Sequence, residues 1–160
     1  MRNRPRAKYM RLAIREAAKN LKKMDGGPFG ACIVKDDLVL AVARNTVLKN
    51  NDSTAHAEIN AIRIACRKMK NFDLSGCSIY STTEPCPMCF SAIHWSKIGV
   101  LVYATAIAAA KKLGFNELAV SAKAIKSKGK SKVKIISGFL AKECANLLKN
   151  WDALEHKISY

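Results

Sequence analysis

Two short segments carry the side chains that could do chemistry together. Residues 54–58 have the sequence Thr-Ala-His-Ala-Glu, and residues 84–89 have the sequence Glu-Pro-Cys-Pro-Met-Cys. They supply the imidazole of His56, the thiols of Cys86 and Cys89, and the free carboxylate of Glu58. Such nitrogen and sulfur donors bind zinc tetrahedrally, and three protein ligands leave the fourth position open for water. The segments therefore predict a catalytic zinc site, although the same donors also suit iron.

The spacing within each segment supports this prediction. Cys86 and Cys89 are three residues apart, so at the start of a helix they share one face, where the positive helix end favours thiolate. His56 and Glu58 are two apart and would diverge inside a helix, so we expect His56 at the helix entry. Zinc lowers the pKa of its bound water towards about 7, and Glu58 would then move protons between that water and a substrate.

Simpler interpretations of the same residues remain open at this point. A single Cys-x-x-Cys pair can be a redox pair of the thioredoxin type. A closed structural zinc site is another possibility, with Cys66, Cys77 or His94 as its fourth ligand. A structural site has no use for the extra carboxylate of Glu58, and the joint pattern therefore favours catalysis.

Hydrophobic periodicity and turn residues predict the elements that hold these segments. We expect helices at residues 6–23, 57–69, 86–95, 106–112, 117–127 and 139–154. We expect strands at residues 31–34, 38–43, 77–82, 98–104 and 133–137, the first two forming a hairpin. This alternation predicts an α/β fold, a three-layer α/β/α sandwich with a five-stranded mixed sheet. Residues 1–160 are expected to form one domain with a C-terminal tail.

Composition indicates a compact protein with a strongly basic surface. Lys and Arg number 28 against 12 Asp and Glu, a net charge of +16. Aromatic residues, on which single-stranded nucleic acids stack, are absent from both main clusters, so a solvated surface is favoured over nucleic-acid binding. The clusters are Arg2, Arg4, Arg6, Lys8 and Arg11, and Lys123, Lys126, Lys128, Lys130, Lys132 and Lys134. No apolar stretch suggests a signal peptide or membrane span, and we expect a cytoplasmic protein with reduced thiols.

The pattern His-x-Glu followed by Pro-Cys-x-x-Cys is a signature of zinc nucleobase deaminases. On the basis of this pattern and the segments below, the sequence resembles the cytidine deaminase superfamily of CMP/dCMP-type zinc deaminases. Within that superfamily it most resembles the bacterial guanine deaminases. The matching segments are residues 26–31 (Gly-Gly-Pro-Phe-Gly-Ala), Asn45, 54–58, 84–89, 92–95 (Ala-Ile-His-Trp), 114–115 (Gly-Phe) and Tyr160. The resemblance implies a cytidine deaminase-like fold, a homodimer with one Zn²⁺ per subunit, and conversion of guanine to xanthine and ammonia.

The resemblance also implies a role for each matching residue. Zinc would be held by His56, Cys86 and Cys89, with Glu58 as proton shuttle and Glu117 helping to move protons to the leaving amine. The base would be bound by Asn45, the Ala57 backbone N–H, Phe29, Trp95, Phe115 and Tyr160. Tyr160 would close over the base from its own chain or from a partner.

The sequence departs from the guanine deaminase pattern at two positions. Ser53 replaces a proline before the Thr-Ala-His-Ala-Glu segment, and Glu117 is one methylene longer than the expected aspartate. A tRNA adenosine deaminase is the main alternative, because those enzymes share both metal-site segments and the high charge suits them. Deamination of another base or nucleoside such as cytosine, and a non-catalytic zinc module that binds RNA, are further alternatives.

Overall fold

The chain is built on one mixed sheet. The computed structural model describes residues 4–160, so Arg2 of the N-terminal basic cluster lies outside the described residues. Five strands lie in the order β2-β1-β3-β4-β5. β1 pairs antiparallel with β2 and β3, whereas β3, β4 and β5 are parallel. The strands are β1 (Gly30–Lys35), β2 (Leu38–Arg44), β3 (Ser78–Thr83), β4 (Val100–Thr105) and β5 (Lys134–Ile136).

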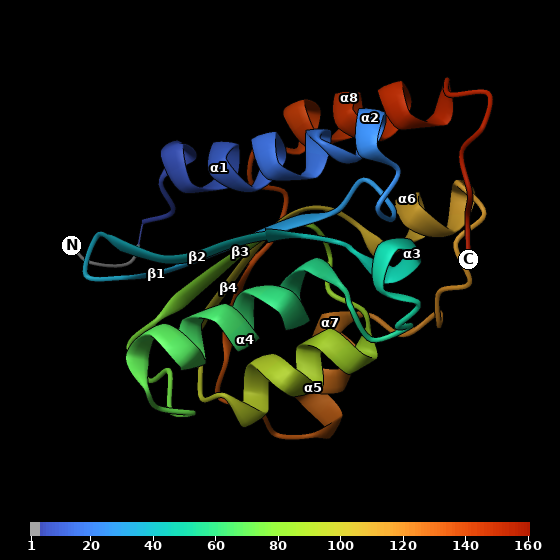
Figure 1. Ribbon diagram of the computed structural model, residues 1–160. Helices are drawn as coiled ribbons and strands as arrows, with labels where there is room; N and C mark the ends of the chain where they lie inside the picture. Colours follow the sequence, from blue (N-terminus) through green and yellow to red (C-terminus); the bar gives the residue numbers. More distant parts are fainter. Residues whose placement is uncertain (1–3) are drawn as a thin grey trace.

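Helices cover both faces of this sheet, which confirms the predicted three-layer sandwich (Figure 1). α1 and α8 lie on one face, and α4, α5 and α7 lie on the other. The helices are α1 (Ala7–Ala18), α2 (Asn20–Lys23), α3 (Val47–Asn50), α4 (Ala57–Met69), α5 (Pro87–Trp95), α6 (Ile107–Lys112), α7 (Ala122–Lys128) and α8 (Ala141–Asp152).

The two layers of core follow from the period-two alternation of side chains along a strand. In β4, Leu101 and Tyr103 pack on the side of α4 and α5, whereas Val102 and Ala104 pack on the side of α1. The apolar run predicted at 98–104 is thus an interior strand buried on both faces. Such double burial explains why that run lacks polar positions.

The β1–β2 hairpin turns through two aspartates. Asp36 and Asp37 have φ values of 44° and 67°, a left-handed conformation that Asp tolerates better than most residues and that a two-residue hairpin turn requires. Tyr9 of α1 donates to an Asp37 carboxylate oxygen at 2.9 Å, so the first helix is fastened to the hairpin tip.

Three boundaries differ from the sequence prediction. The helix expected over 6–23 is interrupted at Lys19, and a short helix, α3, occupies part of the expected loop before His56. The helix expected over 117–127 begins only at Ala122, where the hydroxyl of Ser121 accepts from the backbone N–H of Ala124 at 3.1 Å. A serine cap is a strong start signal, and it overrode the weak helical periodicity before it.

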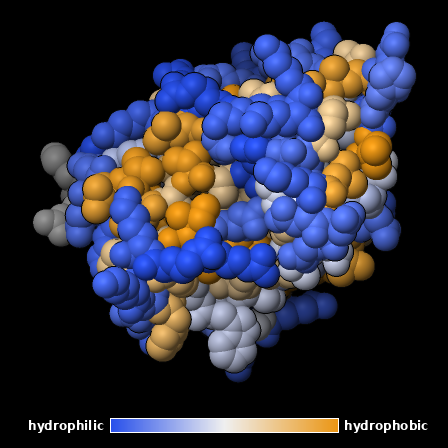
Figure 2. Space-filling model, in the orientation of Figure 1, coloured by the Kyte–Doolittle hydropathy of each residue, from blue (hydrophilic) through white to orange (hydrophobic). Residues whose placement is uncertain are grey.

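Polar side chains cover most of the face seen in Figure 2, with an apolar patch over the edge where β1 and β2 lie. Among residues 4–160, the longest apolar helices fall short of what a bilayer crossing needs. The residues that follow β3 and β4 come together at one end of the sheet, beside the start of β1 and the end of β2. Ligands commonly bind outside the carboxyl ends of parallel strands.

Candidate active site

The imidazole and the two thiols predicted from the sequence meet at this end of the sheet. His56 Nδ1 lies 3.7 Å from Cys86 Sγ and 3.6 Å from Cys89 Sγ. The ligand atoms of the three residues all lie within 4.8 Å of one another. Donors at about 2.0 Å and about 2.3 Å from one tetrahedral zinc ion would be about 3.6 Å apart, so the group fits zinc.

The structure argues against the simpler interpretations of these cysteines. All six cysteines are free, so Cys86 and Cys89 form no disulfide. Among the described residues, neither Cys66, Cys77 nor His94 joins the group of metal donors. His94 instead makes a 3.0 Å contact with the hydroxyl of Ser131. The three donors therefore form a group open on its fourth side, as a catalytic site requires.

His56 occupies the entry of α4, as the two-residue spacing to Glu58 predicts. Its φ and ψ of −66° and 156° are extended, and it is the N-cap of the helix. Asn60 lies one turn into α4, and its side-chain amide donates to the carbonyls of Arg44 and Ala55 at 3.0 and 3.1 Å. These bonds fix the loop before His56 and so aim its ring.

Cys86 is the equivalent N-cap of α5, with Pro87 in the first turn. The neighbouring Cys89 side chain and the imidazole of His56 hold the pKa of the Cys86 thiol down, to about 4, against the effect of burial. The same contact with Cys86, together with burial, raises the pKa of Cys89. Burial acts to lower the pKa of His56, but the contact with Cys86 and the charge of Glu58 outweigh it and raise that pKa.

Glu58 lies in the first turn of α4 and is 6% exposed. Its Oε1 lies 2.8 Å from the hydroxyl of Ser81 in β3, and this hydroxyl also lies 2.6 Å from the carbonyl oxygen of Thr83, so the two oxygens share its single proton. Burial raises the pKa of this carboxyl, because the charged form loses its water. A raised pKa makes the carboxyl a better proton acceptor than an ordinary glutamate, as general acid–base catalysis requires.

A cavity adjoins the three metal donors. It consists of two neighbouring hollows of about 190 and about 20 Å³ that share Phe29, Asn45, His56 and Glu117 as walls. The rings of Phe29 and Phe115 stand edge to face, with centroids 4.9 Å apart. The structure thus brings both predicted phenylalanines to the site, where their apolar surfaces suit a flat ring.

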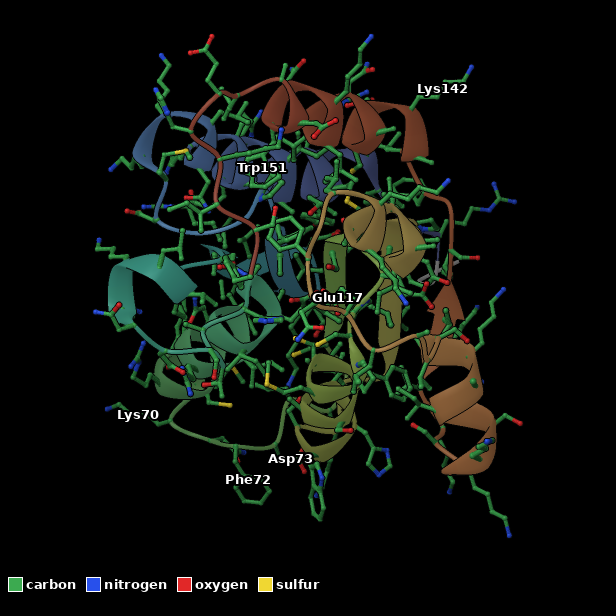
Figure 3. The ribbon with its side chains drawn as sticks, turned by 90° about the vertical axis from the view of Figure 1, so that its right-hand side faces the viewer. Lys70, Phe72, Asp73, Glu117, Lys142 and Trp151 are labelled. Atoms are coloured by element: carbon green, nitrogen blue, oxygen red, sulfur yellow. The ribbon has the colours of Figure 1, made fainter. Side chains whose placement is uncertain are left out.

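Glu117 reaches the same cavity from the loop between α6 and α7. Figure 3 shows it near the middle of the molecule, between α8 above and α5 below. Burial and the negative charge of Cys86 raise the pKa of its carboxyl to about 6. The extra methylene relative to aspartate does not keep Glu117 out of the cavity.

Tyr160 closes one side of the cavity from its own chain. Its hydroxyl accepts from the Gly27 N–H at 3.0 Å and donates to Asn45 Oδ1 at 2.5 Å. Asn45 Oδ1 also accepts from the Val47 N–H at 3.0 Å. With its oxygen occupied twice, Asn45 has its amide NH₂ to offer a ligand in the cavity that it lines.

The side chains of two predicted binding residues, Trp95 and Ala57, are not among the walls of this cavity. Trp95 is the last residue of α5 and is 78% exposed, so this chain does not bring its indole into its own cavity. Six residues separate it from Cys89, which is about 9 Å along a helix. Ala57 has its side chain buried at the start of α4, and its N–H belongs to the first turn, where such groups lack acceptors within the helix.

Sequence reasoning missed two polar residues of the site. Ser81, which bonds Glu58, is one of several hydroxyl residues in β3, and nothing in the sequence distinguishes it from the others. Glu84 lines the cavity and is 7% exposed, although it makes no ion pair among the described residues. The sequence does show a carboxylate two residues before Cys86, and the metal-binding pattern gives it no role.

This fold and donor set define a zinc-type deaminase class. The family model for the cytidine and deoxycytidylate deaminase zinc-binding region matches residues 3–105. The chain therefore belongs to this family of zinc-binding deaminases, which are hydrolytic enzymes.

Two kinds of relative resemble the chain to a similar extent. A guanine deaminase of Bacillus subtilis (strain 168) is 40% identical over 109 residues, which is 68% of this chain and 70% of the relative. A tRNA-specific adenosine deaminase of Buchnera aphidicola subsp. Schizaphis graminum (strain Sg) is 38% identical over 124 residues, 78% of this chain and 79% of the relative.

Solved structures give the same two classes. A guanine deaminase from Nitrosomonas europaea superposes with a TM-score of 0.83 at 29% identity, covering 95% of this chain and 90% of that one. A structure from a study of tRNA:A34 deaminases superposes with a TM-score of 0.77 at 34% identity, covering 89% and 99%. These matches confirm the cytidine deaminase-like fold.

Proposed function

We propose that the chain is a zinc-dependent hydrolase that deaminates a free purine base, converting guanine to xanthine and ammonia. The observation that carries this choice is the closure of the cavity by the chain's own Tyr160, held between Gly27 and Asn45. A cavity that is walled on this side suits a small free base. A base attached to a polynucleotide would need a path for its backbone past this residue.

In this proposal His56, Cys86 and Cys89 hold zinc, which when bound supplies a water that ionises near neutral pH. Glu58 moves the protons of the reaction. Ser81 fixes its Oε1 and leaves Oε2 for proton transfer. Burial keeps its pKa raised, which brings the carboxyl closer to neutral pH, where general acid–base catalysis is effective.

The remaining walls bind and orient the base. The Asn45 amide donates to a ring nitrogen or carbonyl oxygen of the purine, and the first-turn N–H of Ala57 is a second donor. Phe29 and Phe115 pack on the ring. Glu117, with its pKa raised to about 6, can accept a proton from the ring side and hand it to the departing amine.

One substrate panel tests the proposal. We expect ammonia release from guanine to exceed that from adenine, cytosine, their nucleosides and tRNA by at least tenfold in kcat/KM. Replacing Tyr160 by Phe removes both hydroxyl bonds and should lower the guanine value while leaving zinc content unchanged. Faster ammonia release from tRNA than from guanine would reject the free base as substrate.

A tRNA adenosine deaminase is the second candidate, favoured by relatives of similar identity and by the basic surface. In the substrate panel, this activity would be identified by inosine in the tRNA, detected after nuclease digestion. If it is correct, the C-terminal segment that holds Tyr160 must move away from Asn45 to admit the nucleotide.

We further propose that the chain forms a homodimer through the face that carries α4 and α5. Phe72, Trp95 and Leu118 are 69%, 78% and 65% exposed, which is unusual for large apolar side chains. In a dimer, Trp95 could approach the partner's cavity instead of its own. Light scattering on the purified protein measures the mass directly, and a monomer at all concentrations would contradict this.

A further inference from the structure

The carboxylate of Glu84 makes two hydrogen bonds to widely separated parts of the chain. Its Oε2 accepts from the backbone N–H of Ile107 at 3.0 Å, and its Oε1 accepts from the backbone N–H of Ala122 at 2.9 Å. Ile107 is the first residue of α6 and Ala122 is the first residue of α7. A single buried side chain thus receives the free N–H groups of two helix starts, which favour an anion.

These two bonds enclose the segment that forms one wall of the cavity. Residues 107–122 begin and end at Glu84, and Phe115 and Glu117 lie between. Glu84 also stands two residues before Cys86, at the end of β3. The same residue therefore touches the ends of the wall and adjoins the segment that carries two metal donors.

The middle of this wall is held on one side by Phe115, which is buried against Phe29, Trp151 and Tyr160. Leu118 and Val120 are 65% and 41% exposed and make no core of their own. The C-terminal tail adds two bonds, from the Asn116 N–H to the Tyr160 carbonyl at 2.9 Å and from the Ser159 hydroxyl to the Leu113 carbonyl at 2.8 Å. After Phe115 the next buried residue is Ala122, so the placement of Glu117 depends on the Phe115 cluster on one side and on the bond between Glu84 and Ala122 on the other.

We infer that Glu84 is a positioning residue that sets the carboxylate of Glu117 against the His56–Cys86–Cys89 group. It acts through two backbone N–H groups and takes no proton in the reaction. The inference rests on the proposed function insofar as Glu117 has a role in turnover. The placement of the segment itself does not depend on the substrate.

The first measurement is hydrogen exchange in the Glu84→Gln variant. A glutamine offers one oxygen, so it can accept from one N–H but turns an NH₂ group towards the other. We expect the amides of Ile107 and Ala122 and those of residues 113–121 to exchange about tenfold faster or more. Glu143→Gln is the matched control, because it removes the same charge from an exposed carboxylate bonded to Arg11. Unchanged exchange in Glu84→Gln would overturn the inference.

Kinetics then separate positioning from general loss of structure. We expect Glu84→Gln to lower kcat/KM for guanine roughly 10- to 100-fold, since small misplacements of catalytic groups are costly. Zinc content should stay at one per chain. In Glu117→Gln, adding Glu84→Gln should cost less than about threefold more, because both changes disable the same group. Losses that multiply would show that Glu84 acts independently of Glu117.

The outcomes distinguish a failed inference from a failed proposed function. If the protein releases no ammonia from guanine, the exchange measurement still judges whether Glu84 holds the segment, and the kinetic cycle is repeated with the substrate that the panel identifies. If Glu84→Gln does not fold, Glu84→Asp keeps the charge but is too short to reach both N–H groups. Wild-type exchange in that variant would equally overturn the inference.

Discussion

The charged side chains of two regions of this chain differ in their burial and in their bonding partners. At the end of the sheet, Glu58 and Glu84 are buried, and each carboxylate has a defined hydrogen-bond donor. Between Glu117 and Glu143 the chain carries seven lysines and no acidic residue. Among residues 4–160 none of these lysines takes part in an ion pair.

The difference shows that the number of charges is a poor guide to where the chemistry lies. A buried carboxylate is costly unless it is bonded, so each one at the site must be fixed by its surroundings. Exposed lysines cost little and can be scattered over the surface without partners. In the proposed mechanism the protons are moved by the carboxylates of Glu58 and Glu117, whereas the net charge of the chain is set mostly by side chains in water.

The largest effect is expected at the most deeply buried carboxylate. Glu58→Gln keeps the size of the side chain and an oxygen for Ser81 but removes the titratable group. We expect ammonia release to fall by roughly 10²–10⁴-fold or more while zinc content is retained. Glu155→Gln is an exposed control. Substantial turnover in Glu58→Gln would remove this residue from the mechanism.

An intermediate effect is expected at Glu117, on stability. Its pKa is raised from 4.5 to about 6, so the folded state binds the proton more tightly than the unfolded state. The contribution of Glu117 to stability is therefore greatest below pH 4.5 and is lost as the pH rises through 6. Glu117→Gln, always neutral, should be more stable than the wild type at pH 8 by about 1 kcal/mol, after discounting for partial exposure.

At pH 4 the advantage of Glu117→Gln should vanish. Denaturant unfolding of the chelator-treated protein at both pH values measures the two differences. A wild type that is the more stable protein at pH 8 would show that the carboxylate is stabilised by its surroundings, contrary to the burial described above.

The smallest effect is expected on the basic surface. Replacing Lys126, Lys130 and Lys132 together by alanine should leave kcat/KM for guanine within twofold. The free energy of unfolding should change by no more than about 0.5 kcal/mol per site. A control triple on other elements, Lys22, Lys23 and Lys112, removes the same charge. A tenfold loss confined to the first triple would show that this surface belongs to the substrate site.

Local patterns predicted most of the fold. The apolar alternation and the turn residues Asp36 and Asp37 predicted the β1–β2 hairpin. The helical periodicity of residues 57–69 predicted α4 with its observed bounds. The donor spacing predicted that His56, Cys86 and Cys89 would converge. The hairpin and the helix depend on residues that are close in the sequence, and the donor group depends on the coordination geometry of zinc. Both can be inferred from the types and spacing of the residues.

The features that were missed depend on contacts between distant segments. Ser121 was a local signal for the start of α7, but the bond from the Ala122 N–H to a carboxylate 38 residues earlier has no local signal. Trp95 follows the apolar face of α5, but only the length of that helix decides how far from the cavity the indole lies. The proximity of Tyr160 to Asn45, 115 residues apart, followed from resemblance alone.

Gly26 and Gly27, which lie beside Asn45, limit how far directed evolution could change the substrate specificity of this protein. A Cβ on Gly26 would lie 2.1 Å from Asn45 Oδ1, and one on Gly27 would lie 2.6 Å from the ring of Phe29. Any side chain there would collide with the groups that receive a ligand, so that wall can hardly vary. Mutant libraries aimed at a new substrate should concentrate on residues 116 and 118–120 instead, where exposed side chains leave room for change.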